Sequence, residues 1–149
     1  MFGSRRARRT IDMNTSTPLP AHEDATDQAV SDRFTTAIIT RDYAALNATL
    51  SPEVRLRALV LPGPFELTGP AAVTAQFEQW FAGGRSFHVI GHSTAEVGSR
   101  VHAEWTIARS PDSPSAAPLT AQQHAFLTVG GDGVETIDLV CSGWQEAPR

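Results

Sequence analysis

The chain has 149 residues, of which 41% are hydrophobic and 19% charged, a balance typical of one globular domain with a single sizeable core. No apolar run approaches the roughly 20 residues of a membrane-spanning helix, so we expect no membrane partner. The formal net charge of −4 falls to −8 when the four arginines among the first ten residues are left out. An acidic body argues against nucleic-acid binding. The single cysteine excludes an internal disulfide and a Cys-rich zinc site, and it fits the cytoplasm.

Residues 1–27 are expected to form a disordered tail, because they are polar, rich in Arg, Ser, Thr and Pro, and lack hydrophobic periodicity. The segment "SRRARRT" suggests a twin-arginine export signal or a basic arm. No apolar stretch follows it, so we expect no export. One folded domain is expected over residues 28–146.

Three helices are predicted in the first half of the domain. Apolar residues recur at helical spacing from about Thr26 to Thr40. Asp42 is a typical N-cap residue and predicts a short second helix that Ser51-Pro52 ends. Pro70 stands where a third helix begins, and Gly83-Gly84 ends it. The apolar faces of the second and third helices are formed by Tyr43, Leu46 and Leu50 and by Val73, Phe77, Trp80 and Phe81.

Alternating apolar and polar residues predict the strands. "VRLRALVLPG" forms the first strand, and "FEL" forms a short return strand before the third helix. Residues 85–97 and 100–109 flank Gly98-Ser99, a two-residue hairpin turn, and residues 119–144 supply two more strands. Because helices come first and most strands last, the fold class is α+β, with a curved, mostly antiparallel sheet wrapped around about three N-terminal helices.

The last hairpin, "LTAQQHAFLTVGGDGVETIDLVCSGW", fixes which side chains face inward. A three-residue turn at residues 131–133 pairs Gln123 with Cys141 and His124 with Val140. The more apolar face is then the inner one. A four-residue turn would shift the register and make His124 and Asp138 the alternative site residues. The inner face is predicted to hold Ala121, Gln123, Ala125, Leu127, Ile137, Leu139 and Cys141, and the outer face Gln122, His124, Phe126, Thr136, Asp138, Ser142 and Trp144.

The Gly98-Ser99 turn sets the preceding hairpin in the same way. It places His92 opposite Trp105 and Ile90 opposite Ile107. His92 is therefore the candidate general acid or base, because an imidazole beside an indole in a semi-apolar pocket titrates near neutral pH. The competing interpretation is a core histidine held by an ordinary hydrogen bond. The inner face should also carry His88, Thr94 and Glu96, and the outer face Arg100, His102 and Glu104.

Gln123 is the candidate donor to a carbonyl or enolate oxygen, because its amide offers N–H groups without charge. A structural hydrogen bond within the sheet is the alternative role. Cys141 has no basic partner in the pattern, so a small buried hydrophobe is its simpler role. His88 and His92 lie on one strand about 13 Å apart, too far to share an ion, and no metal site is expected. No glycine-rich phosphate loop follows a strand, so no cofactor is expected.

The order of elements, with "ITRDYAALNATLSPEVRLRA", "GPAAVTAQFEQWF" and "VGGDGVETIDLVCSG", resembles the nuclear transport factor two-like superfamily over about Asp27 to Gln145. Within that superfamily the SnoaL-like polyketide cyclases and ketosteroid isomerases look nearest. The resemblance implies a cone-shaped fold, an apolar pocket inside the sheet and often a homodimer through its outer face. It implies no single activity, because the fold hosts both enzymes and binders.

The isomerase-type members of that superfamily carry three chemical groups that this chain lacks. Their helix tyrosine corresponds to Phe34, their first carboxylate to Ala58 and their second acid to Ala125. Steroid-isomerase chemistry by that constellation is therefore not expected.

The predicted function is a cofactor-independent cyclase or isomerase for an apolar, oxygenated small molecule of the polyketide-intermediate type, as in antibiotic biosynthesis. In this hypothesis His92 moves a proton, Gln123 holds an oxygen, and the pocket folds the substrate. The alternative is a non-catalytic ligand-binding or dimeric interaction protein of the same fold. The predicted substrate-binding residues are Phe34, Leu56, Ala58, Trp105, Ala125, Leu127, Leu139 and Cys141.

Overall fold

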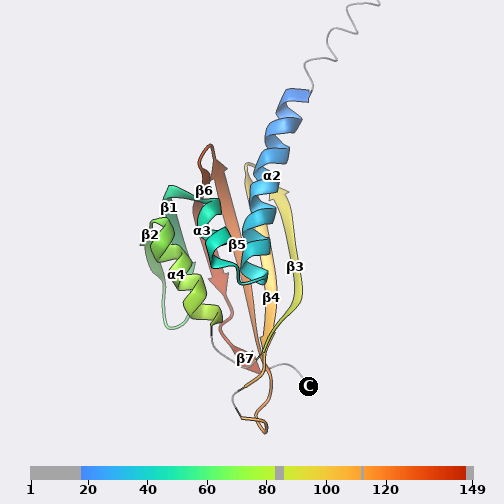
Figure 1. Cartoon of the computed structure of the whole chain (residues 1–149), viewed down its shortest axis with the longest axis vertical. Coiled ribbons are helices and arrows are strands. Elements are labelled where there is room, and N and C mark those ends of the chain that lie inside the picture. Colours follow the sequence, from blue (N-terminus) through green and yellow to red (C-terminus); the bar gives the residue numbers. More distant parts are fainter. Residues whose placement is uncertain (1–17, 83–85, 112, 147–149) are drawn as a thin grey trace, which may run out of the picture.

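The computed structural model describes residues 18–82, 86–111 and 113–146. Within them, helices α2 (Pro18–Ile39), α3 (Tyr43–Thr49) and α4 (Pro70–Phe81) lie against one face of a curved sheet (Figure 1). This arrangement confirms the predicted α+β class. The strands are β1 (Leu50–Leu59), β2 (Phe65–Thr68), β3 (Phe87–Val97), β4 (Arg100–Arg109), β5 (Leu119–Gly130), β6 (Gly133–Cys141) and β7 (Gln145–Glu146).

The sheet brings the first strand of the chain beside the last long one. Its order is β2-β1-β6-β5-β4-β3, and the short β7 pairs with β5. All neighbours are antiparallel except β1 and β6, which run parallel. The two hairpins β3–β4 and β5–β6 therefore form most of the curved surface on which the helices lie (Figure 1).

Local sequence signals account for the starts of α3 and α4. The Asp42 carboxylate accepts a hydrogen bond from the Ala45 amide at 3.0 Å, which confirms the predicted cap of α3. Pro70 occupies the first turn of α4, after Gly69 with a φ of 91°. Helix α2 begins at Pro18, well before the predicted start at Thr26. Residues 1–17, the core of the expected tail, and Gly83-Gly84 lie outside the described residues.

Strand β1 starts earlier than its sequence suggests. It begins at Leu50, which was expected on a helix face, and it includes Pro52, which was expected to separate helix from strand. The pairing of β1 with β6 shifts register between Leu50 and Arg55. Proline lacks the amide N–H that a regular ladder needs, and an irregular stretch of this kind accommodates it.

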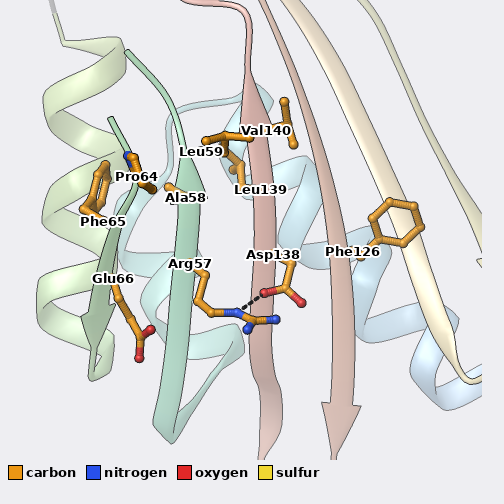
Figure 2. A pocket seen from close by; sticks show the side chains of 10 residues that line it. All are labelled: Arg57, Ala58, Leu59, Pro64, Phe65, Glu66, Phe126, Asp138, Leu139 and Val140. Atoms are coloured by element: carbon orange, nitrogen blue, oxygen red, sulfur yellow. Dashed lines mark hydrogen bonds and ion pairs between the residues drawn. The ribbon is translucent and has the colours of Figure 1, made fainter. Parts of the chain in front are cut away.

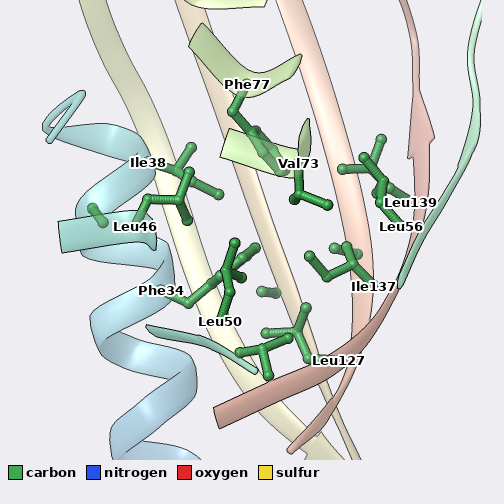
Figure 3. Close-up of a cluster of buried hydrophobic side chains, with 14 of the residues drawn as sticks. Phe34, Ile38, Leu46, Leu50, Leu56, Val73, Phe77, Leu127, Ile137 and Leu139 are labelled. Atoms are coloured by element: carbon green, nitrogen blue, oxygen red, sulfur yellow. The ribbon is translucent and has the colours of Figure 1, made fainter. Parts of the chain in front are cut away.

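The core fills the space between the helices and the inner face of the sheet (Figure 3). Phe34 of α2 and Phe77 of α4 meet edge to face, with ring centroids 6.1 Å apart at 88°. The indole of Trp105 lies 6.3 Å from both rings. Burying each large apolar side chain stabilises the fold by about 1.5–3 kcal/mol. Aromatic rings therefore occupy the middle of the cone.

The β5–β6 hairpin has the predicted register beyond its turn. Gln123 pairs with Cys141 and His124 with Val140. The turn itself differs, since Gly130 pairs with Gly133 and only two residues lie between them. A register shift next to Thr128 absorbs the difference. The division into inner and outer faces is therefore the predicted one along most of both strands.

The β3–β4 hairpin agrees with its prediction only near the turn. Val97 pairs with Arg100 and His92 with Trp105 as expected, but an irregularity falls between Val89 and Gly91. Val89, rather than Ile90, therefore pairs with Ile107, and His88 pairs with Ala108 on the outer side. The predicted inward facing of His88 is wrong, because one bulged residue reverses the alternation before it.

No helix among the described residues is long and apolar enough to cross a membrane.

Candidate functional site

A hollow of about 310 Å³ opens at the end of the sheet where β6 stops and β5 begins. Trp80 and Phe81 of α4 form one wall, and the chain after β6 closes another side. We call this cavity the Gln123 hollow. Its lining includes Trp80, Phe81, Ala121, Gln123, Cys141 and Trp144. Two of the polar side chains predicted for the pocket, Gln123 and Cys141, therefore meet at one cavity.

Gln123 is almost fully buried, with 1% of its surface exposed. Its Oε1 accepts a hydrogen bond of 2.8 Å from the indole Nε1 of Trp105 on the neighbouring strand. An indole N–H only donates, so the atom that it contacts must be the amide oxygen. Among the described residues, none accepts a hydrogen bond from the amide nitrogen. The structural role of Gln123 within the sheet is therefore observed, and its role as a donor to a ligand stays a prediction.

Cys141 lies opposite Gln123 across the β5–β6 pair, as the register predicts. Its Sγ accepts a hydrogen bond from the Gly143 amide at 3.3 Å. Among the described residues that line the hollow, none is a histidine, arginine or carboxylate within reach of the sulfur. A nucleophilic thiolate needs such a partner, so the surroundings favour a structural thiol.

The aromatic Trp144 lines the hollow, although strict alternation predicted it on the outer face. Strand β6 ends at Cys141, and Gly143 turns the chain with a φ of 74°. Trp144 then packs edge to face on Phe81 and lies under the guanidinium of Arg109, 4.1 Å from its Cζ. The glycine was the available signal for this reversal, because a positive φ breaks the alternation of a strand.

Most of the predicted substrate-binding residues belong to the packed core. They lie on the inner side, as expected, and each is at most 3% exposed. Of the predicted set, only Cys141 lines the Gln123 hollow. The core members are Phe34, Leu56, Ala58, Trp105, Ala125, Leu127 and Leu139.

His92 lies away from the Gln123 hollow, although it pairs with Trp105 as predicted. Strand β3 is the edge of the sheet, and its His92 is exposed instead of sitting in a semi-apolar pocket. The imidazole borders a separate groove of about 370 Å³ beside α2, with Asp32 and Thr36. Trp105 stands between His92 and Gln123 in the ladder, so the two predicted catalytic residues do not share one cavity.

The outer face carries the charged groups of the sheet, including His124 and Asp138 as predicted. Asp138 accepts a hydrogen bond from Arg57 at 2.6 Å and another from Arg100 at 2.8 Å. The bond from Arg57 lowers the pKa of Asp138, partial burial opposes this, and Arg100 lowers it further. The pair Arg57–Asp138 lies in an open groove of about 610 Å³ with Phe126 and Val140 (Figure 2). These ionic contacts hold β1, β6 and β4 together from outside.

Comparison with known proteins identifies the fold family. A family model described as SnoaL-like domain matches residues 31–134, more than half of the chain. The chain belongs to the SnoaL-like domain family. A search of curated proteins finds no match.

Solved structures show the same SnoaL-like architecture. A proposed polyketide cyclase from Xanthomonas campestris pv. campestris is 18% identical, with a TM-score of 0.58 over 76% of this chain and 88% of that one. A protein with a ketosteroid isomerase-like fold from Catenulispora acidiphila, solved with trimethylamine, is 14% identical, with a TM-score of 0.58 over 74% and 82%. A protein with a cystatin-like fold from Xanthomonas campestris is 16% identical, with a TM-score of 0.60 over 78% and 90%. Such identities show the shared fold alone.

Within this SnoaL-like fold, the two positions where the isomerase-type members carry acidic groups are buried in the packed core. Ala58 pairs with Leu139, which pairs with Ala125, so the two alanines lie in one row across three strands. Both are at most 3% exposed, and Phe34 is fully buried nearby in the same core. An unpaired carboxylate in this row would meet a large desolvation cost.

Proposed function

We propose that this SnoaL-like domain binds a small apolar molecule that carries a carbonyl or enolate oxygen, and that the Gln123 hollow is the binding site. The observation that carries the proposal is the buried amide of Gln123, whose oxygen is committed to Trp105. Its N–H groups can then donate to an oxygen on the ligand without bringing a charge into the cavity. Trp80, Phe81 and Trp144 supply the apolar walls.

The size and chemistry of the hollow favour a binder over an acid–base enzyme. Its volume of about 310 Å³ lies at the lower end of the roughly 300–1,000 Å³ typical of ligand pockets. A molecule of one or two fused rings fits that space. Cys141 is the only titratable side chain among its described lining residues. Proton transfer by a positioned acid or base has no evident agent in this cavity.

Ring closure by confinement is the second candidate function. The structural likeness to the proposed polyketide cyclase favours it, because cyclisation needs a folded substrate more than it needs a charged catalyst. In this variant Gln123 stabilises an enolate oxygen, and the aromatic walls set the conformation of the chain. His92 has no part in it, because it borders a different groove. Product formation from a synthetic poly-β-ketone would support cyclisation, and binding without turnover would support the simple binder.

A matched pair of ligands tests the role of the Gln123 amide. The probes are 2-acetylnaphthalene, which has a ketone, and 2-ethylnaphthalene, which lacks one. By isothermal titration we expect Gln123→Leu to weaken ketone binding about 10-fold, the effect of one hydrogen bond of about 1.4 kcal/mol. Binding of the hydrocarbon should change little. Equal affinity of wild type and variant for the ketone would contradict the proposal.

Two controls separate loss of the donor from loss of the cavity. Gln122→Leu changes the same residue type one position earlier, on the exposed outer side, and should leave both affinities unchanged. Retained binding of 2-ethylnaphthalene by Gln123→Leu shows that the hollow is intact in that variant.

We also propose that two copies of the chain associate through the outer face of the sheet. Exposed apolar side chains on that face support this, with Leu59 58% and Val140 53% exposed on paired positions of β1 and β6. Sedimentation equilibrium should give twice the chain mass for the wild type. The double variant Leu59→Ser, Val140→Thr should shift the mass toward one chain, and a monomeric wild type would contradict the proposal.

A further inference from the structure

Three potential metal ligands converge on the outer face of β4 and β5. Glu104 pairs directly with His124 across the two strands. His102 lies two residues before Glu104 on β4 and therefore projects from the same face. The ligand atoms of the three side chains all lie within 4.8 Å of one another. The pattern of either strand considered alone does not reveal this cluster, because His124 comes from a different strand from the other two members.

The distances within the cluster suit one bound ion. His102 Nε2 lies 3.0 Å from His124 Nδ1, and that nitrogen lies 3.2 Å from Glu104 Oε2. Donor atoms about 2.0–2.1 Å from a tetrahedral zinc ion are separated from each other by about 3.3 Å. The two printed separations, 3.0 and 3.2 Å, are therefore close to the spacing of zinc ligands.

Neighbouring groups already orient two of the three ligands. Ser93 Oγ donates to Glu104 Oε1 at 3.1 Å, which leaves Oε2 of the same carboxylate toward His124. The ring of His102 packs against Phe126, with centroids 4.9 Å apart. Such outer partners fix ligand orientation in metal sites and strengthen binding. Both strands also lie inside the sheet order, between β6 and β3, which gives the cluster a rigid base.

Exposure and charge complete the requirements of an open site. The side chains of His124 and Glu104 are 39% and 36% exposed, so an ion and a water ligand can reach them. The nearby cation Arg100 is held by Asp138 at 2.8 Å and so is partly neutralised. Imidazole nitrogens with one carboxylate favour late first-row divalent ions, and zinc is the most available of these.

We propose that His102, Glu104 and His124 form a binding site for a divalent transition-metal ion, with Zn²⁺ as the best fit and water in the fourth position. The ion would link β4 to β5 on the outer face, opposite the Gln123 hollow. The site is independent of the proposed ligand and would bind metal whether or not the hollow binds a small molecule. His124 pairs with Val140 of the proposed dimer surface, so the zinc titration is repeated on the double variant Leu59→Ser, Val140→Thr, in which the site stays open and one ion per chain is again expected. A simple hydrogen bond between the two imidazoles is the competing explanation of the geometry.

The test is a titration of the full chain, freed of any affinity tag, with ZnCl₂ by calorimetry and with CoCl₂ by visible absorption. We expect one ion per chain and the intense visible absorption of a four-coordinate cobalt site. Zinc binding should weaken at least about 10-fold in each of the variants His102→Gln, His124→Gln and Glu104→Gln. The loss in Ser93→Ala should be smaller, because Ser93 only orients Glu104.

Control variants and a second readout keep the outcome decisive. His88→Gln and His92→Gln change exposed histidines of β3 and should leave zinc affinity unchanged. Zinc should raise the melting temperature of the wild type but not that of His124→Gln, because an ion that binds only the folded state stabilises it. Absence of saturable binding, one ion per two chains, or equal losses in the control variants would overturn the proposal.

Discussion

The two faces of the β4–β5 pair differ sharply in burial and in polarity. On the inner face, Trp105 and Gln123 are almost fully buried and are joined by one neutral hydrogen bond. On the outer face, Glu104 and His124, their next neighbours in sequence, are partly exposed, with Glu104 Oε2 3.2 Å from His124 Nδ1. Solvent access explains the contrast, because a buried polar group needs a partner whereas an exposed one can use water. The inner face is therefore suited to binding an uncharged ligand, and the outer face is suited to charged groups and a metal ion.

Truncating Trp105 on the inner face should cost much more stability than truncating its outer neighbour Glu104, and this is the largest effect that we expect. Trp105→Ala removes a side chain that packs on Phe34 and Phe77 and leaves a cavity. We expect a loss of about 3–5 kcal/mol in the free energy of unfolding, measured by urea denaturation. Glu104→Ala, the adjacent outer residue, should cost under about 1 kcal/mol. Similar losses for both variants would contradict the division into faces.

Removing the buried amide should have an intermediate effect. In Gln123→Leu the indole N–H of Trp105 loses its only described acceptor, and an unsatisfied buried donor costs about 1–3 kcal/mol. The double variant Gln123→Leu, Trp105→Phe removes both hydrogen-bonding groups. Denaturation should show that it is more stable than the sum of the single losses predicts, since no donor is left unpaired. Strict additivity would show that the hydrogen bond contributes nothing.

The outer ion pairs should give the smallest effect, and one that depends on pH. Asp138 has a lowered pKa in the folded chain, because Arg57 and Arg100 bond to its carboxylate. Its contribution, about 1 kcal/mol or less, is present above the unfolded pKa of about 3.9 and is lost as pH falls through the lower folded pKa. Asp138→Asn should therefore be less stable than wild type at pH 7, and the difference should shrink as the pH falls below about 3.9. A constant difference across that range would rule out this linkage.

Much of the fold followed from alternation and from turn residues. Gly98 and the glycines at 130, 131 and 133 located both hairpins well enough to place Gln123 opposite Cys141 and His92 opposite Trp105. A bulge has a weaker signal, and the one beside Gly91 reversed His88. Trp144 was misplaced for a similar reason, because β6 ends just before it.

The candidate site was only partly predictable, because it depends on contacts between distant segments. Gln123 was found from its register, but the filled core that displaces the pocket to the end of the sheet depends on how Phe34, Phe77 and Trp105 pack together. His102 and His124 lie 22 residues apart and meet only through strand pairing. The residue pattern along one strand does not show which residues of another strand lie beside it.

The central claim is that the amide nitrogen of Gln123 donates to a ligand in the hollow. Nitrogen–proton correlation spectra record the side-chain NH₂ signals of Gln123 directly, with Gln123→Leu to assign them. Titration with 2-acetylnaphthalene should move both signals in a saturable way, together with the indole signal of Trp144, while 2-ethylnaphthalene should move only the Trp144 signal. Unchanged Gln123 amide signals at a ketone concentration that saturates the Trp144 shift would contradict the account.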